Sequence, residues 1–151
     1  MSTAEVVVCV LDPGVTTGFV VMRGVLDLDE KDIVYDVLER AELLWPESAL
    51  RPLQVDADFW VVEDFILRSE KAKGVSARDP LLITVRIIGA LQIMLPPEKL
   101  VLQRNVDKAV CPDENLKKLK LWDSSPHIRD AIRHGVIFLN KWMINTLKST
   151  S

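Results

Sequence analysis

Residues 6–24 read VVVCVLDPGVTTGFVVMRG, and this stretch decides which fold class the chain can adopt. The β-branched run from Val6 to Leu11 is typical of a strand that is buried on both faces of a sheet. The run stops at Asp12, passes through a Pro-Gly turn and two threonines, and resumes from Phe19 to Met22 as a hairpin partner. The stretch therefore predicts the first hairpin of a sheet, with one carboxylate at the end of a central strand.

The composition predicts one soluble globular domain spanning residues 1–151. A hydrophobic content of 48% is far too high for a disordered chain. No stretch reaches the roughly 18 uncharged apolar residues of a membrane span, and no basic segment precedes the first apolar run as it does in a signal peptide. Cys9 and Cys111 lack the spacing of a disulfide framework or a metal site. We therefore expect a cytoplasmic protein with two reduced thiols and no membrane partner.

Charge is distributed unevenly along the chain. Residues 1–64 carry a net charge of −10 and residues 65–151 a net charge of +7, within an overall charge of −3. Such an asymmetry predicts a basic face that can contact phosphates. Solvated charge scattered over the surface explains the same numbers equally well, so charge alone does not establish nucleic-acid binding.

The segment after the first hairpin allows two interpretations. Arg23-Gly24 resembles a second tight turn, which makes Val25 to Leu28 the third strand. Apolar residues then recur at helical spacing from Ile33 to Leu44, with Asp29 as a possible N-cap and Pro46 as the stop, and we predict a helix there. The alternative makes Ile33 to Leu38 the third strand.

The second half of the chain alternates strands with helices. The predicted elements are a strand at Phe59–Val62 that ends on Glu63 and Asp64, a polar loop at 68–79, a helix at Leu81–Leu95, a strand at Leu100–Leu102, and a helix from Ser125-Pro126 to about Leu147. The helix at 81–95 is apolar on nearly every side, so it needs burial in the core or against a partner subunit. The whole order predicts an α/β arrangement, a mixed sheet with helices on its faces.

Four side chains are expected to meet at one edge of this sheet. Asp12 and Glu63 end central strands, while His127 and Asp130 lie three residues apart on one face of the last helix, a face that His134 continues. Such a cluster is costly unless a cation sits in it, and hard oxygen ligands suit Mg²⁺ or Mn²⁺. Two ions about 4 Å apart are the usual arrangement for phosphodiester hydrolysis. Each residue alone is explained equally well as a turn cap, a strand exit or a solvated helix start, so the prediction depends on their joint placement.

Three motifs carry a resemblance to a known family. They are LDPGVTTGFVV at 11–21, VVEDFI at 61–66 and SPHIRDAIRHG at 125–135. In this order and spacing they resemble the RuvC branch of the RNase H-like superfamily, the Holliday junction resolvases, and most of all its bacteriophage members. The resemblance implies a five-stranded mixed sheet, with the first three strands antiparallel and helices on both faces. It also implies a homodimer that binds a four-way DNA junction and nicks two opposing strands with Mg²⁺ or Mn²⁺.

The resemblance assigns roles to particular residues. Asp12, Glu63, His127 and Asp130 match the catalytic metal ligands, and a histidine in that set predicts weaker Mg²⁺ binding and better activity with Mn²⁺. The helix at 81–95 matches the one that packs on its twin across a two-fold axis, and we assign to this interface Leu82, Val85, Arg86, Gly89 and Ile93.

DNA contacts are expected in three places. Gly14 and Gly18 leave space for a turn and for a nearby strand of DNA, and the hydroxyls of Thr16 and Thr17 are candidates for phosphate contacts or simply begin a strand. Phe65 follows Glu63 where the family places a junction-contacting residue. The predicted basic contacts are Arg68, Lys71, Lys73, Arg78, Lys117 and Lys118. The family's catalytic basic residue before the last helix has no clear match, so a cleavage-sequence preference is not predicted.

The motifs favour a metal-dependent endonuclease that is selective for branched DNA. One alternative is a junction-binding protein on the same fold that does not cut, and another is a related nuclease with a different branched substrate. An ATPase of the actin and sugar-kinase type also uses an Asp-Gly-Thr-Thr-like hairpin. That fold needs two domains and several hundred residues, so the length of this chain excludes it.

Overall fold

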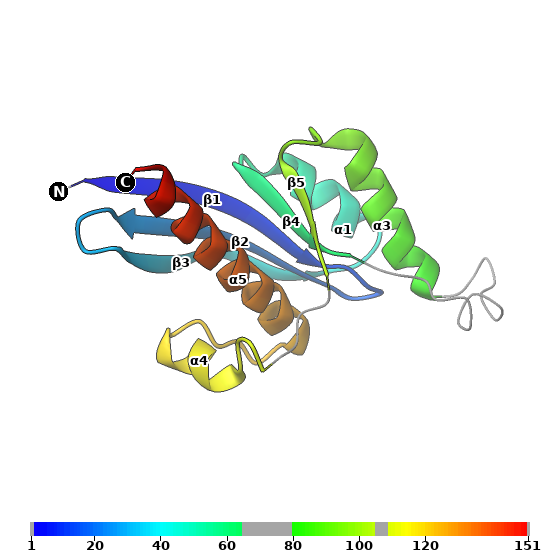
Figure 1. Cartoon of the computed structure of the whole chain (residues 1–151). Helices are drawn as coiled ribbons and strands as arrows, with labels where there is room; N and C mark the ends of the chain where they lie inside the picture. The colour runs from blue at the N-terminus through cyan, green and yellow to red at the C-terminus, as the bar shows by residue number, and fades with distance from the viewer. Residues whose placement is uncertain (1, 65–79, 105–108, 151) are drawn as a thin grey trace.

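A five-stranded mixed sheet forms the centre of the computed structural model, which describes residues 2–64, 80–104 and 109–150 (Figure 1). Its strands lie in the order β3-β2-β1-β4-β5. Their bounds are β1 (Thr3–Asp12), β2 (Thr17–Asp27), β3 (Asp32–Leu43), β4 (Phe59–Glu63) and β5 (Leu100–Gln103). The first three strands pair antiparallel, while β4 pairs parallel with both β1 and β5.

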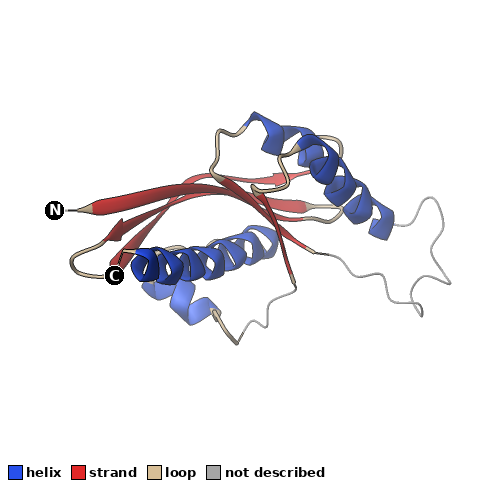
Figure 2. Cartoon of the chain, turned by 45° about the horizontal axis from the view of Figure 1, so that its top comes forward, coloured by secondary structure: helices blue, strands red, loops and turns tan. Residues whose placement is uncertain are grey.

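Helices cover both faces of the sheet (Figure 2). One face carries the long helix α5 (Pro126–Ser149) and the short helix α4 (Asp113–Lys118). The other face carries α1 (Glu47–Leu50), the 3₁₀ turn η1 (Arg51–Gln54) and α3 (Pro80–Met94). This arrangement confirms the predicted fold class. Among the described residues, no helix is long and apolar enough to cross a membrane.

Strand β1 is buried on both faces, as its β-branched run predicts. Val6, Val8 and Val10 pack into the hydrophobic cluster beneath α5, and Cys9 and Leu11 pack into the cluster beneath α3. Successive side chains of a strand point to opposite faces, so one run of apolar residues contributes to two cores. The exposed fractions of these five side chains lie between 0% and 3%.

The predicted helix from Ile33 to Leu44 is wrong, because this segment forms the edge strand β3. The alternative, a strand beginning at Ile33, is the observed structure, and it runs on to Leu43. Apolar residues four positions apart, such as Ile33 and Val37, satisfy a helical period and a strand period alike, because four is twice the strand repeat. Pairing with β2 along its whole length decides between the two periods.

The predicted turn at Arg23-Gly24 is also wrong. Both residues lie inside β2, which runs without a break to Asp27 and includes most of the expected third strand. The hairpin turns later, where the side chain of Asp27 accepts hydrogen bonds from the backbone N–H groups of Asp29 and Glu30 at 2.9 Å each. Asp29 is therefore part of a β-turn and caps no helix.

The later elements agree with the sequence to within a few residues. β4, α3, β5 and α5 all lie where the pattern predicts them. Ser125 caps α5, because its hydroxyl accepts from the backbone N–H of Ile128 at 3.2 Å, and Pro126 follows in the first helical turn. The predicted polar loop at 68–79 lies outside the described residues.

The two cysteines are free and buried on opposite faces of the sheet. Cys9 belongs to the cluster beneath α3 and Cys111 to the cluster beneath α5, so the sheet separates them. Burial raises the pKa of the Cys9 thiol to about 12. Because the thiolate is the reactive form, Cys9 is an inert core residue.

Candidate active site

Three carboxylates from two neighbouring strand ends line one pocket. Leu11 of β1 pairs with Val62 of β4, so the next residues, Asp12 and Glu63, emerge together at the carboxyl edge of the sheet. The pocket has a volume of about 220 Å³, and its lining is Asp12, Pro13, Glu63, Asp64, Leu81 and Thr84. The structure thus brings together the two strand-end acids that the sequence singled out.

Asp64 and Thr84 complete this pocket, and neither was among the predicted site residues. The backbone N–H of Asp64 donates to the carbonyl oxygen of Gln103 at 2.7 Å, which holds Asp64 at the strand end beside Glu63. The hydroxyl of Thr84 on α3 donates to the carbonyl oxygen of Pro13 at 3.4 Å. Its position next to Glu63 in the sequence could have indicated Asp64. No local pattern in the sequence indicates Thr84.

Helix α5 begins beside the same sheet edge. Gly18 of β2 is the register partner of Asp12, and a β-carbon on Gly18 would overlap the backbone carbonyl of His127. His127 is exposed there, one helical turn before Asp130. Gly18 therefore allows close packing of α5. This corrects the expectation that Gly18 leaves space for DNA.

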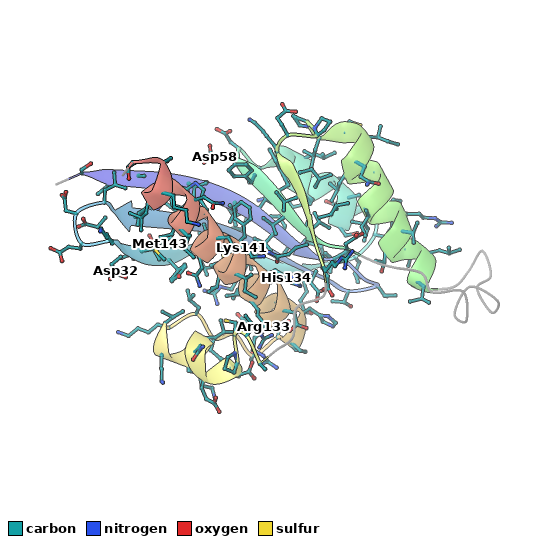
Figure 3. All side chains as sticks on the ribbon, viewed as in Figure 1. Asp32, Asp58, Arg133, His134, Lys141 and Met143 are labelled. Atoms are coloured by element: carbon teal, nitrogen blue, oxygen red, sulfur yellow. The ribbon has the colours of Figure 1, made fainter. Side chains whose placement is uncertain are left out.

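Asp130 is held by an arginine on its own helix. The guanidinium of Arg133 donates from Nη1 to Asp130 Oδ1 at 2.5 Å, from Nη2 to Asp113 Oδ1 at 2.5 Å, and from Nε to the carbonyl oxygen of Cys111 at 2.6 Å. The Arg133 side chain is only 4% exposed. It therefore ties the segment around α4 to the turn of α5 that carries Asp130 (Figure 3).

His134 contacts Glu63 from the sheet-facing side of α5. Its Nε2 lies 3.4 Å from Glu63 Oε2, and its Nδ1 lies 2.5 Å from Gln103 Oε1. Of the two α5 histidines, His134 is thus the one with a described contact to a strand-end acid. Its spacing from Asp130 in the sequence predicted the correct helix face. Its contacts with Glu63 and Gln103 are visible only in the tertiary structure.

The pocket has the donor chemistry of a hard divalent cation. Asp12, Glu63 and Asp64 offer carboxylate oxygens, which Mg²⁺ and Mn²⁺ prefer. Within residues 2–64, 80–104 and 109–150, no three acidic, histidine or cysteine side chains are arranged to hold an ion as they stand. The donor types fit a metal, and the side chains would have to close around it.

The predicted DNA contacts fall into three groups. The Thr17 side chain is fully buried and its hydroxyl donates to the carbonyl oxygen of Gly14 at 3.1 Å, so it stabilises the turn and is not exposed to a phosphate. This corrects one of the two interpretations of Thr17. Gly14 and Thr16 are partly exposed in the same turn. Five other candidates lie outside the described residues: Phe65, Arg68, Lys71, Lys73 and Arg78.

An exposed tryptophan after α4 contacts two cationic side chains. The ammonium of Lys117 and the guanidinium of Arg129 each lie 5.3 Å from the centre of the Trp122 ring, which is 40% exposed. Lys117 and Lys118 are both exposed on α4, as their expected role requires. Trp122 was not among the predicted contacts, although an aromatic residue close to several lysines was a usable signal.

Helix α3 has one face in the core and one face in solvent. Ile87 and Leu91 are fully buried, whereas Val85 is 44% and Ile93 83% exposed. A β-carbon on Gly89, between the last two, would meet nothing within 4 Å. Of the residues assigned to a dimer interface, Val85, Arg86 and Ile93 are thus exposed in the single chain, and Leu82 and Gly89 are partly exposed.

Two solved structures similar to this chain are Holliday junction resolvases bound to junction DNA. A fowlpox virus resolvase in complex with Holliday junction DNA superimposes with a TM-score of 0.55 at 12% identity, covering 90% of this chain and 98% of that one. T. thermophilus RuvC in complex with a Holliday junction substrate gives a TM-score of 0.55 at 14% identity, covering 85% and 89%. No family model and no curated protein matches the sequence. The chain has the fold of these resolvases, a RuvC-like fold, as its motifs predicted.

Proposed function

We propose that this protein is a metal-dependent endodeoxyribonuclease that resolves four-way DNA junctions by paired nicks. The observation that carries the proposal is the joint placement of Asp12 and Glu63 in one pocket at the carboxyl ends of β1 and β4. The likeness to known resolvases supports the proposal, since both superimposed structures contain a resolvase bound to Holliday junction DNA. The more specific likeness to bacteriophage members stays a prediction.

In this proposal the strand-end acids bind the metal. Asp12 and Glu63, joined by Asp130 and His127 from α5, would hold Mg²⁺ or Mn²⁺, with two ions expected. Like charges in one pocket repel unless a cation balances them, so the acids favour binding of a divalent ion. The bound ions would supply a Lewis acid and an activated water for phosphodiester hydrolysis. Arg133 holds one oxygen of Asp130 and so fixes the direction of that carboxylate.

Branched DNA and a second copy of the chain are the proposed partners. Lys117 and Lys118, with Trp122 nearby, are exposed groups that suit backbone and base contacts. A dimer through the exposed face of α3 would cover Ile93 and place two active sites about a two-fold axis. Such a pair of sites matches the symmetry of two nicks in a four-way junction.

The test is a charge-matched pair of variants. We expect Asp12→Asn to abolish nicking of a synthetic four-way junction and to leave junction binding within a few fold. Asp56→Asn makes the same charge change at an exposed position away from the pocket, and we expect it to cut normally. The substrates are junction, fork, flap and linear duplex, each with Mg²⁺ and Mn²⁺. Retained nicking by Asp12→Asn would overturn the assignment of the site.

A second candidate is a junction-binding protein that does not cut. What favours it is that the likeness to the two solved structures is a likeness to junction-bound complexes, and it therefore concerns binding. In that case the unmodified protein would bind the junction tightly and leave every strand intact with either metal. The same assay therefore distinguishes the two functions.

A further inference from the structure

A buried histidine and glutamine stand between α5 and the strand end that carries Glu63. His134 is 3% exposed and Gln103 is 8% exposed. Gln103 ends β5 and is the register partner of Glu63. The imidazole therefore meets two neighbouring strand ends at once, with Gln103 at Nδ1 and Glu63 at Nε2.

The chemistry of the three groups determines where the protons lie. A carboxylate only accepts hydrogen bonds, so a stable contact with Glu63 requires a proton on His134 Nε2. Gln103 offers either its carbonyl oxygen or, with the amide turned over, its NH₂ group to Nδ1, and so it accommodates either state of that nitrogen. The distance of 3.4 Å from Nε2 to Glu63 Oε2 is long for a hydrogen bond. Contacts of this kind are often loose before the site is loaded and tighten afterwards.

We propose that His134 is a positioning residue for Glu63: it donates from Nε2 to Glu63 Oε2 and thereby orients the carboxylate toward Asp12, while Gln103 holds the imidazole ring. This inference rests on the proposed role of Glu63 as a metal ligand. A ligand oriented in advance loses less freedom when the ion binds, so removing the donor weakens metal binding. His134 itself does not touch the metal or the DNA in this role.

The polar contacts of its ring nitrogens distinguish His134 from a residue that only fills the core. The buried neighbours of His134 on α5, Ile132 and Val136, pack in the cluster beneath that helix. His134 instead directs both ring nitrogens at polar atoms of β4 and β5. A purely structural histidine would affect the stability of the fold and leave the metal affinity of the folded protein unchanged.

The first experiment measures Mn²⁺ binding to the DNA-free protein by electron paramagnetic resonance. We expect His134→Leu to raise the Mn²⁺ Kd by about 10–100-fold. His134→Gln keeps an N–H donor, and we expect it to stay within a few fold of the unmodified protein. Asn140→Leu is the control, because it removes a polar partner of Tyr35 from the same helix, away from the pocket. Each variant is first shown to be folded by circular dichroism.

The second experiment observes the contact without any metal. The chain has two histidines, so ¹⁵N labelling of their rings gives a simple spectrum, which His127→Gln assigns. We expect Glu63→Gln to shift the ring signals of His134, because it replaces the charged acceptor at Nε2. Unchanged His134 signals, or a folded His134→Leu variant with the original Mn²⁺ affinity, would overturn the proposal.

The outcomes also separate this inference from the proposed function. If Asp12→Asn abolishes nicking while His134→Leu binds Mn²⁺ normally, the nuclease assignment stands and the positioning role fails. If His134 and Glu63 are coupled in the ring spectrum and nicking persists in Asp12→Asn, the contact stands and the assigned site fails. If the unmodified protein binds no Mn²⁺, both fail.

Discussion

Gly18 of β2 and His127 of α5 touch backbone to backbone, so that a β-carbon on Gly18 would lie 1.9 Å from the His127 carbonyl oxygen. The same β-carbon would lie 2.4 Å from the carbonyl carbon. No side-chain movement can relieve such an overlap, because both atoms belong to the helix backbone. The contact joins the first turn of α5 to the strand position that pairs with Asp12.

We therefore expect Gly18→Ala to displace the start of α5 and to destabilise the fold by about 3 kcal/mol. Urea unfolding measures the loss, and junction cleavage should fall with it because His127 and Asp130 move away from Asp12. Gly89→Ala is the matched control at an open helix position, where alanine should stabilise the monomer fold by about 0.5–1 kcal/mol. A Gly18→Ala variant with unchanged stability would contradict the packing described here.

Glutamate substitutions on the exposed face of α3 test whether this face forms the proposed dimer interface. We expect Ile93→Glu and Val85→Glu to remain folded and to shift the protein from dimer to monomer in light scattering. Both side chains are exposed in the single chain, so a carboxylate there costs nothing until a partner covers it.

Ile87→Glu is the contrasting variant on the same helix. Ile87 is fully buried, so a glutamate there should unfold the chain and not merely separate two subunits. If Ile93→Glu and Val85→Glu both stay dimeric, the exposed face of α3 is not the subunit interface.

Part of the free energy of unfolding is expected to depend on the ionisation of Asp123. Burial by itself raises the pKa of Asp123, but the Ser125 backbone N–H and the Arg40 guanidinium outweigh it and hold that pKa below its usual range. Because the folded pKa is depressed, the stabilisation is complete above the unfolded value of 3.8 and disappears as the pH falls through the folded value. Arg40 Nη1 lies 2.9 Å from Asp123 Oδ2, which ties β3 to the segment before α5.

We therefore expect Asp123→Asn to lower the Tm at pH 7, with a difference from the unmodified protein that narrows below about pH 4. Thermal unfolding between pH 3 and pH 7 measures it. Asp56→Asn, at an exposed position, serves as the control and should follow the unmodified protein throughout. If the difference in Tm between Asp123→Asn and the unmodified protein is the same at every pH, the charge of Asp123 does not stabilise the fold.

Local patterns predicted those parts of the molecule that depend on neighbouring residues in the chain. The β-branched run of β1 indicated burial on both faces, and Ser125 with Pro126 indicated the start of α5. The acids at the ends of β1 and β4 were also visible, because parallel strands present their carboxyl ends at one edge. These predictions needed only periodicity, capping and strand direction.

The tertiary structure decided whatever depends on a partner distant in the chain. Pairing with β2 made residues 32–43 a strand, although their apolar spacing also suited a helix. The packing of α3 chose which side of an evenly apolar helix is core. The contacts of His134 with Glu63 and of Gly18 with His127 join residues 71 and 109 positions apart. No local pattern encodes such contacts, because they exist only once the sheet has formed and α5 has packed against it.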